Sequence, residues 1–238
     1  GLYASAGTAQ VLVRSFNNAA LSGKEETTGL SYGPRPAEGL CVLGAIQSAG
    51  GSVNLFNRLF FEGDSFDAML AEGENIQNAV AQVLYFPYLA GSGPPRMVSA
   101  AMGLEMASTK AEVLLALYQG LAFESRVILE AMGKPAQQIV ICGGLTAHTA
   151  YLQLLADSLN LSVEVPSCQE GTLYGAAALM AQAAGGAFSE INMDTVYLPN
   201  QNRSSVLLDL YTKAYLPLRQ VQLDYYDNEG DAGADRPW

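Results

Sequence analysis

The sequence predicts an α/β fold in which a sheet is layered with helices. Segments with the two-residue alternation of strands recur between segments in which apolar residues have helical spacing. A strand, a helix and a second strand follow one another between residues 138 and 165, the order of a strand-helix-strand unit. The sequence contains neither a repeat of fixed period nor a low-complexity linker, so we expect a single domain.

The N-terminal part of the chain predicts strands. Residues 2–16 indicate two short strands joined by a tight turn at 5–8. The polar stretch 17–38 is expected to be a loop that contains one further edge strand. An apolar strand follows at 40–46, and a helix is expected over 48–61.

The most clearly marked element is a helix from Ser108 to Met132. Thr109 and Glu112 have the spacing of a capping box at its start, and Gly133 is a typical stop. Its apolar residues recur on one face, namely Leu114, Leu117, Leu121 and Ile128. This spacing gives the helix one apolar face.

The strand-helix-strand unit is predicted from residue 138 onward. Residues 138–142 form a strand, and a glycine turn at 143–144 leads into the next helix. That helix directs Leu152, Leu155 and Leu159 inward. A short strand at 162–165 completes the unit.

Two helices and a tail are expected after this unit. The helix over 171–184 carries small residues at 175–178, and we expect it to pack closely against another backbone. A last helix is expected from residue 204 to about 223. We therefore divide the chain into a lobe, 1–223, and an acidic tail, 224–238, expected to be disordered or partner-dependent.

Charge and hydropathy exclude several classes of partner. The formal net charge of -11 and the pI near 4.4 oppose binding to nucleic acid or to anionic membranes. No apolar run approaches the roughly 20 residues that span a bilayer. The N-terminus also lacks the profile of a signal peptide. We expect a cytoplasmic protein that binds neither nucleic acid nor membrane.

Cysteine and histidine give no sign of a metal or hydrolytic site. Cys41, Cys142 and Cys168 are too scattered for a disulfide framework, and none has metal-ligand spacing with His148. His148 is the single histidine, and no Gly-x-Ser-x-Gly elbow occurs. We therefore expect reduced thiols, no protein-bound metal and no charge-relay triad.

Three glycine turns follow predicted strands, at Gly7-Thr8, Gly50-Gly51 and Gly143-Gly144. A glycine lets a ligand approach the backbone, and a helix that starts just after the turn offers N–H groups and a positive dipole end. Paired glycines are usually turn formers, but together these three can frame one nucleotide. Neither the dinucleotide-binding nor the Walker motif occurs.

The stretch from Ile139 to Gly186 resembles the C-terminal signature region of the FGGY carbohydrate kinases. A strand ends in Gly-Gly, a helix and a short strand ending in Val-Pro follow, and a helix with the pattern E-x-x-x-x-G-A-A completes the unit. Glu170 and residues 175–177 fill that last pattern. Further segments resemble the family in the expected order, at residues 5–8, 49–55, 86–91, 197–199 and 211–215.

This resemblance, which covers nearly all of residues 1 to 222, implies a fold and an activity. The implied fold is an actin-like, ribonuclease H-like lobe with a mixed sheet flanked by helices. The implied reaction transfers the γ-phosphate of ATP, with Mg²⁺, to a hydroxyl of a sugar or polyol. A homodimer is compatible with it.

By the same resemblance, Gly7 and Thr8 contact the β- and γ-phosphates through a backbone N–H and the hydroxyl. Gly50 and Asn54 line the nucleotide cleft.

On the adenosine side, Gly143 and Gly144 let the nucleoside lie against the backbone, and His148 contacts the adenine. Relatives often have Asn at the position of His148. A second departure lies at 91–96, which reads G-S-G-P-P-R where many relatives read G-E-R-x-P.

The resemblance places the catalytic Asp and most of the sugar pocket in an N-terminal lobe. The chain does not start with Met, and its first residues run directly into a strand, so we expect that this lobe has been removed. Glu62, Asp64 and Asp67 belong to a polar helix end or loop, and Asp157 is expected to be solvated. We therefore name no catalytic residue and expect the chain alone to be inactive.

Two alternative functions stay open. The first is an actin-like ATPase that is not a kinase, such as a reductive activator, although the cysteine pair that holds an iron-sulfur cluster in such activators is missing here. The second is a binding module whose nucleotide site has decayed, as the departures at His148 and Ser92 suggest.

Overall fold

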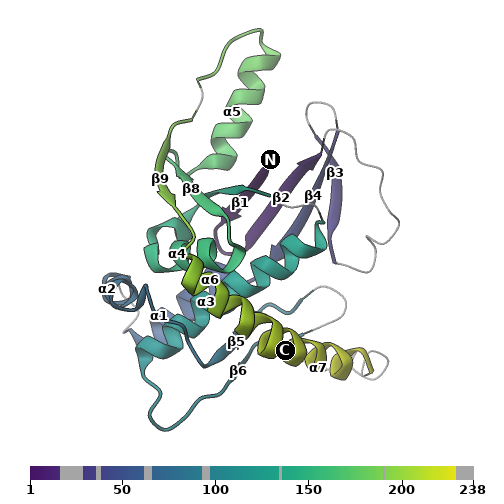
Figure 1. Ribbon diagram of the computed structural model, residues 1–238. Helices are drawn as coiled ribbons and strands as arrows, with labels where there is room; N and C mark the ends of the chain where they lie inside the picture. Colours follow the sequence, from purple (N-terminus) through teal and green to yellow (C-terminus); the bar gives the residue numbers. More distant parts are fainter. Residues whose placement is uncertain are drawn as a thin grey trace.

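A seven-stranded mixed sheet forms the centre of the protein, as a computed structural model shows (Figure 1). The structure describes residues 1–16, 29–35, 39–61, 66–92, 97–133, 136–189 and 191–228. Residues 17–28 and 36–38 of the predicted loop lie outside these ranges, as do the acidic residues Glu62 and Asp64, most of the departure at 91–96 and the end of the predicted tail.

The strands are arranged in the order β3-β4-β2-β1-β7-β8-β9. Their bounds in that order are Ser31–Pro34, Leu40–Ile46, Gln10–Phe16, Leu2–Ala6, Gln138–Cys142, Ser162–Pro166 and Met193–Tyr197. β1 is parallel to β7 and β7 to β8, while the other neighbours are antiparallel. The carboxyl ends of β1, β7 and β8 therefore meet at one edge of the sheet.

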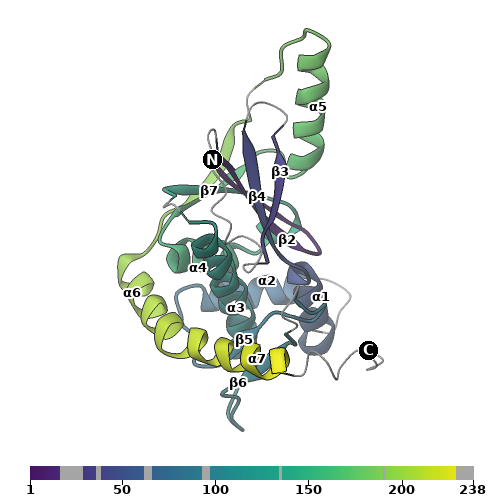
Figure 2. The ribbon, with the colours of Figure 1, turned by 90° about the vertical axis from the view of Figure 1, so that its right-hand side faces the viewer.

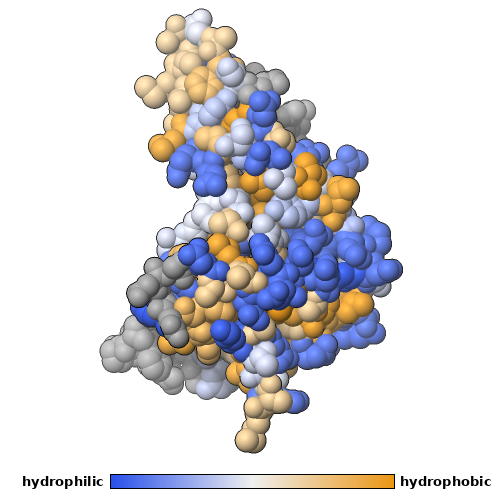
Figure 3. All heavy atoms as spheres, turned by 90° about the vertical axis from the view of Figure 1, so that its left-hand side faces the viewer, coloured by the Kyte–Doolittle hydropathy of each residue, from blue (hydrophilic) through white to orange (hydrophobic). Residues whose placement is uncertain are grey.

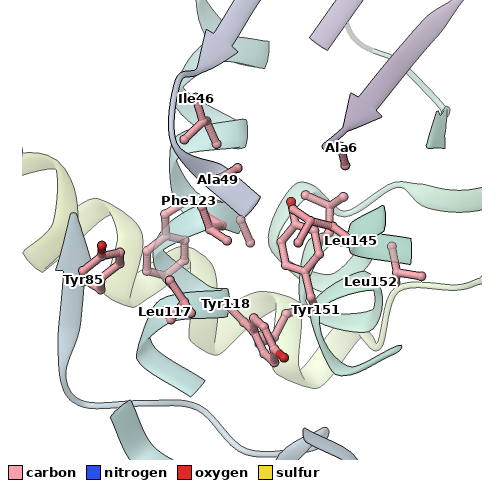
Figure 4. Close-up of a cluster of buried hydrophobic side chains, with 14 of the residues drawn as sticks. Ala6, Ile46, Ala49, Tyr85, Leu117, Tyr118, Phe123, Leu145, Tyr151 and Leu152 are labelled. Carbon is pink, nitrogen blue, oxygen red and sulfur yellow. The ribbon is translucent and has the colours of Figure 1, made fainter. Parts of the chain in front are cut away.

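Two helices cover one face of this sheet, α3 (Lys110–Ala131) and α4 (Thr149–Leu159) (Figure 2). Alternate residues of the strands point toward them, so that Leu2, Ala4 and Ala6 of β1 are buried. Figure 4 shows the resulting core, in which aromatic and aliphatic side chains from the strands, α1, β5, α3 and α4 gather.

The remaining elements lie around this layer. They are α1 (Ala49–Phe60), α2 (Asp67–Ile76), β5 (Leu84–Phe86), β6 (Ala100–Met102), a 3₁₀ turn η2 (Gly144–Ala147), α6 (Gln201–Leu210), a π-helical turn η3 (Tyr211–Tyr215) and α7 (Leu216–Asn228). α6, η3 and α7 replace the single predicted last helix. α7 ends at Asn228, beyond the boundary expected near residue 223.

Helix α3 begins as the capping pattern predicts. The Glu112 amide donates to Thr109 Oγ1 over 3.2 Å, and the helix ends before Gly133, whose φ is +70°. Gly120, in the middle of α3, allows close contact with β5. A Cβ built on Gly120 would lie 2.1 Å from the carbonyl oxygen of Tyr85.

Helix α5 (Gly171–Ala183) differs from its prediction. It projects away from the sheet (Figures 1 and 2) and buries none of its residues. No atom lies within 4 Å of a Cβ built on Gly175. The close helix packing expected from its small residues is therefore wrong for the part of the chain that the structure describes. The projection forms the apolar top of the molecule in Figure 3.

His148 lies in the core, directly after the 3₁₀ turn η2 that follows β7. Its side chain is 5% exposed, its Nδ1 shares a hydrogen bond of 2.7 Å with the Tyr118 hydroxyl, and its ring meets those of Tyr118 and Phe66 edge-on. Burial lowers the pKa of His148 to about 4. The imidazole therefore packs against Tyr118 and Phe66 in the interior of the domain.

Replacing Gly120 with Ala should lower the free energy of unfolding by about 1–3 kcal/mol, because the added methyl overlaps the Tyr85 carbonyl. Gly175→Ala is the matched control, since the same methyl meets open space in a helix and should raise stability by roughly 0.5–1 kcal/mol. Urea denaturation of both variants measures the difference. Equal effects of the two substitutions would contradict the close contact between α3 and β5.

His148 should make the protein less stable as the pH falls. The unfolded chain takes up a proton near pH 6.5, whereas the folded chain does so only near 4, so this stability is complete above 6.5 and declines toward 4. The difference should be about 3 kcal/mol between pH 7 and pH 4. Comparison with His148→Asn by urea denaturation at each pH isolates it from the carboxylates. An imidazole proton resonance that titrates near pH 6.5 in the folded chain would refute this placement.

Candidate functional site

The predicted glycine turns gather at the edge where the three parallel strands end. β1 ends at Ala6, β7 at Cys142 and β8 at Pro166, and Ser5 lies opposite Cys142 in the register. Ligands of open α/β sheets bind beyond the carboxyl ends of such strands. Gly7, Thr8 and Gly144 are exposed at this edge, whereas one hollow of about 400 Å³ lies at the opposite end of β1 and β7, beside Gly1 and Gln138.

The turn between β1 and β2 is held by the first turn of α1. The Gly50 amide donates to the carbonyl of Gly7 over 3.1 Å, and the Gly51 amide donates to that of Thr8 over 3.2 Å. A Cβ on Gly50 would lie 2.3 Å from the Gly7 oxygen, so only glycine permits this approach. Two of the amides that the sequence predicts to be free for a ligand are therefore already used.

Gly7 and Thr8 are both exposed at this turn. The Gly7 amide donates to the Ala9 carbonyl over 2.9 Å, so the predicted phosphate contact through that N–H is taken within the turn. The Thr8 side chain remains as an exposed hydroxyl at the edge. Asn54 is exposed one turn further along α1.

The two glycines after β7 have different environments. Gly143 has a φ of +104°, and a Cβ there would lie 2.6 Å from the Ala6 carbonyl oxygen. Gly143 is thus required for β1 and β7 to come together. Gly144 is exposed, and nothing lies within 4 Å of a Cβ built on it. Only Gly144 of this pair therefore borders open space.

His148 does not join these groups as a side chain. It follows η2 closely in sequence, but its imidazole is buried against Tyr118, as described above. An adenine contact through this ring is therefore not supported by its position. The sequence signal was misleading because a helix start near a glycine turn fixes the backbone, whereas the rotamer depends on the surrounding core.

Gly171 also lies at this edge, which the sequence did not predict. It is the first residue of α5, and a Cβ there would lie 2.6 Å from Cys142 Sγ, so α5 begins directly against the end of β7. Burial raises the pKa of the Cys142 thiol, and a hydrogen bond from the Gly171 amide acts in the opposite direction. A glycine that opens a helix just after a strand was the available signal.

Of the carboxylates weighed in the sequence, Asp67 and Asp157 lie in the described ranges, and neither belongs to a cluster that could hold a cation. Within the described ranges, no group of three His, Cys, Asp or Glu residues is close enough to hold a metal ion. Asp157 is not solvated as expected but fully buried, 3.1 Å from Arg203 in an ion pair, and it accepts the Asn200 amide over 2.7 Å. It stabilises the junction of α4 and α6.

No helix in the described part of the chain has the length and hydrophobicity to cross a membrane.

Comparison with known sequences finds similar carbohydrate kinases. The family model of the C-terminal domain of the FGGY carbohydrate kinases matches residues 2–184. The xylulose kinase of Staphylococcus epidermidis strain RP62A is 29% identical over 189 residues, which are 73% of this chain and 37% of that protein. The xylulose kinase of Bacillus subtilis is 29% identical over 190 residues, which are 73% and 38% of the two chains.

Solved structures show the same fold. A ligand-bound xylulose kinase from Lactobacillus acidophilus superposes with a TM-score of 0.81 at 18% identity, over 95% of this chain and 48% of that one. Plasmodium falciparum glycerol kinase with ADP superposes with a TM-score of 0.72 at 18% identity, over 91% and 46%. The chain thus spans about half the length of these proteins or less. It has the predicted actin-like ATPase fold, and it belongs to the FGGY family of carbohydrate kinases, whose C-terminal domain it forms.

Proposed function

We propose that this chain binds ATP at the carboxyl edge of β1, β7 and β8 and forms the nucleotide half of a sugar or polyol kinase. The observation that carries the proposal is the convergence of Gly7-Thr8, Gly50 and Gly143-Gly144 at that edge. One structural neighbour is a glycerol kinase with ADP, and related sequences are xylulose and glycerol kinases. The acceptor class therefore stays broad.

The open sides of the edge suggest how the nucleotide lies. The Thr8 hydroxyl is the exposed side-chain oxygen of the β1–β2 turn and is suited to the phosphates. Gly144 leaves room for the nucleoside against the backbone, and Asn54 lies on the exposed side of α1. Gly50 and Gly143 act indirectly, because they hold the turn and the two strands in place.

Mg²⁺ in phosphoryl transfer is held largely by phosphate oxygens and water, and it neutralises charge on the phosphates. The Thr8 hydroxyl is the oxygen donor of this edge that fits such a role. The base that accepts the acceptor's hydroxyl proton, and most of the acceptor pocket, we assign to an N-terminal lobe. The chain by itself should then bind nucleotide without transferring phosphate.

Gly144→Leu tests where the nucleotide lies. The new side chain meets no protein atom within 4 Å of its Cβ, so the fold should be kept, but it fills the space proposed for the nucleoside. Titration calorimetry with Mg-ADP should show saturable binding to the wild type and at least about tenfold weaker binding to the variant, a loss of roughly 1.4 kcal/mol.

Gly175→Leu is the matched control, because it adds the same side chain to an equally open glycine on α5. Its affinity for Mg-ADP should equal that of the wild type. Unchanged affinity in Gly144→Leu would refute the placement of the nucleoside. A folded wild-type chain that does not bind Mg-ADP would refute nucleotide binding by this lobe alone.

A further inference from the structure

We propose that Arg219, on the C-terminal helix α7, is a positioning residue for the nucleotide site. Through Glu124 and Tyr88 it holds the first turn of α1 against the turn at Gly7 and Thr8. The effect on nucleotide affinity rests on the proposed function, whereas the effect on α1 can be measured without nucleotide.

The first step is a buried carboxylate that several elements share. Glu124 of α3 accepts hydrogen bonds from the hydroxyls of Tyr88 (2.7 Å) and Tyr215 (3.1 Å). Arg219 donates two hydrogen bonds to the same carboxylate, from Nε to Oε2 and from Nη2 to Oε1, each over 3.2 Å. Arg219 Nε also donates to the Tyr88 hydroxyl over 3.0 Å. Because Glu124 is buried, its charge requires this partner.

The guanidinium of Arg219 stays protonated beside Glu124. Burial is the largest single effect and lowers the pKa of its guanidinium, but the charge of Glu124, the hydrogen bond to it and the nearby Tyr88 and Tyr215 hydroxyls together outweigh burial, and the net direction is upward. Tyr88 is held neutral, because burial and the nearby Glu124 both raise the pKa of its hydroxyl. The cluster is therefore one carboxylate, one guanidinium and neutral tyrosines.

The π-helical turn η3 brings α7 to this carboxylate. Its wider turn stacks Tyr211 on Tyr215, with ring centroids 6.0 Å apart, and both hydroxyls donate to glutamates of α3, Glu130 and Glu124. The Tyr215 ring also stacks on Phe86, with centroids 4.8 Å apart. π-turns within helices are often found at functional sites. Here the turn sets the start of α7 so that Arg219 reaches the interior.

The second step leads from Tyr88 to α1. The segment 85–88 contacts the start of α1 through hydrogen bonds and through one pair of aromatic rings. The Ser48 hydroxyl donates to the Pro87 carbonyl over 3.4 Å, and the Tyr85 hydroxyl donates to Ser52 Oγ over 3.4 Å. Both serines are buried, and the rings of Phe56 and Tyr85 pack edge-on at 5.1 Å.

The third step is the contact of α1 with the site itself, through the amides of Gly50 and Gly51 and the carbonyls of Gly7 and Thr8. These two amides precede the first bonds that α1 makes within itself, so their protection from solvent depends on the docking of the turn. A contiguous set of packed and hydrogen-bonded groups thus joins Arg219 to Thr8. Whether such a set transmits an effect is decided by a coupling measurement.

Arg219→Met removes the guanidinium and leaves Glu124 buried without a counter-charge. Amide exchange measured by NMR should become about three- to thirtyfold faster at Gly50 and Gly51, and the Kd for Mg-ADP should rise by a similar factor. Adding Glu124→Gln should restore part of both, because the uncompensated charge is removed. Arg219→Lys keeps the charge but loses the paired hydrogen bonds to Glu124, so it should change the exchange rates and the Kd less than Arg219→Met does.

Two controls separate positioning from general loss of stability. Lys213→Met makes the same charge change in an exposed pair with Asp209, whose side chains are 72% and 60% exposed, and should change neither readout. Arg203→Met breaks the buried pair with Asp157 and should destabilise the chain without singling out Gly50 and Gly51.

The outcomes are distinct. If Arg219→Met speeds exchange at Gly50 and Gly51 no more than Arg203→Met does at equal global stability, the positioning role is overturned. If the wild type fails to bind Mg-ADP but Arg219→Met still exposes the two amides selectively, positioning stands and nucleotide binding by this chain fails.

Discussion

The close approach of α1 to the β1–β2 turn is the contact on which the rest of the site depends. Gly50 has no side chain, so its amide can reach the Gly7 carbonyl while Gly51 reaches that of Thr8. A second approach without a side chain, at Gly143, lets β7 lie beside the end of β1. Backbone groups rather than charged side chains thus hold the turns of this edge in place.

Two buried ion pairs attach the C-terminal helices to the domain. Arg203 of α6 pairs with Asp157 of α4, and Arg219 of α7 pairs with Glu124 of α3. The family model ends at residue 184, so both arginines lie outside the matched region while both acids lie within it. The Coulomb energy of a buried ion pair is largely offset by the cost of desolvating the two charges, so the pair adds little net stability. Its hydrogen bonds nevertheless fix the geometry of the two helices that it joins. The helices therefore have one defined position on the domain.

The sequence predicted most of the sheet, because segments such as 40–46 and 138–142 are runs of apolar residues, and such a run is a local signal for a buried strand. Thr109 likewise predicted the start of α3, since a cap is a local interaction. β5 and β6 were missed because each has only three residues, and β9 was missed because its residues are largely exposed and it is fixed by pairing with β8. For the site, the sequence located the three turns. It could not separate Gly144 from Gly143, or place His148 and Asp157, because these depend on which groups the fold brings against them.

Helix α5 has a consequence for how copies of this protein behave toward one another. Its thirteen residues carry no charge and none is buried, while Leu173 and Met180 are 67% and 74% exposed. The net charge of -11 supplies a long-range repulsion that keeps such surfaces apart at neutral pH. Near the pI of about 4.4, or in concentrated salt, that repulsion vanishes and colloidal self-association through α5 is favoured. At neutral pH the net charge of -11 therefore opposes contact between the α5 helices of two copies of this chain.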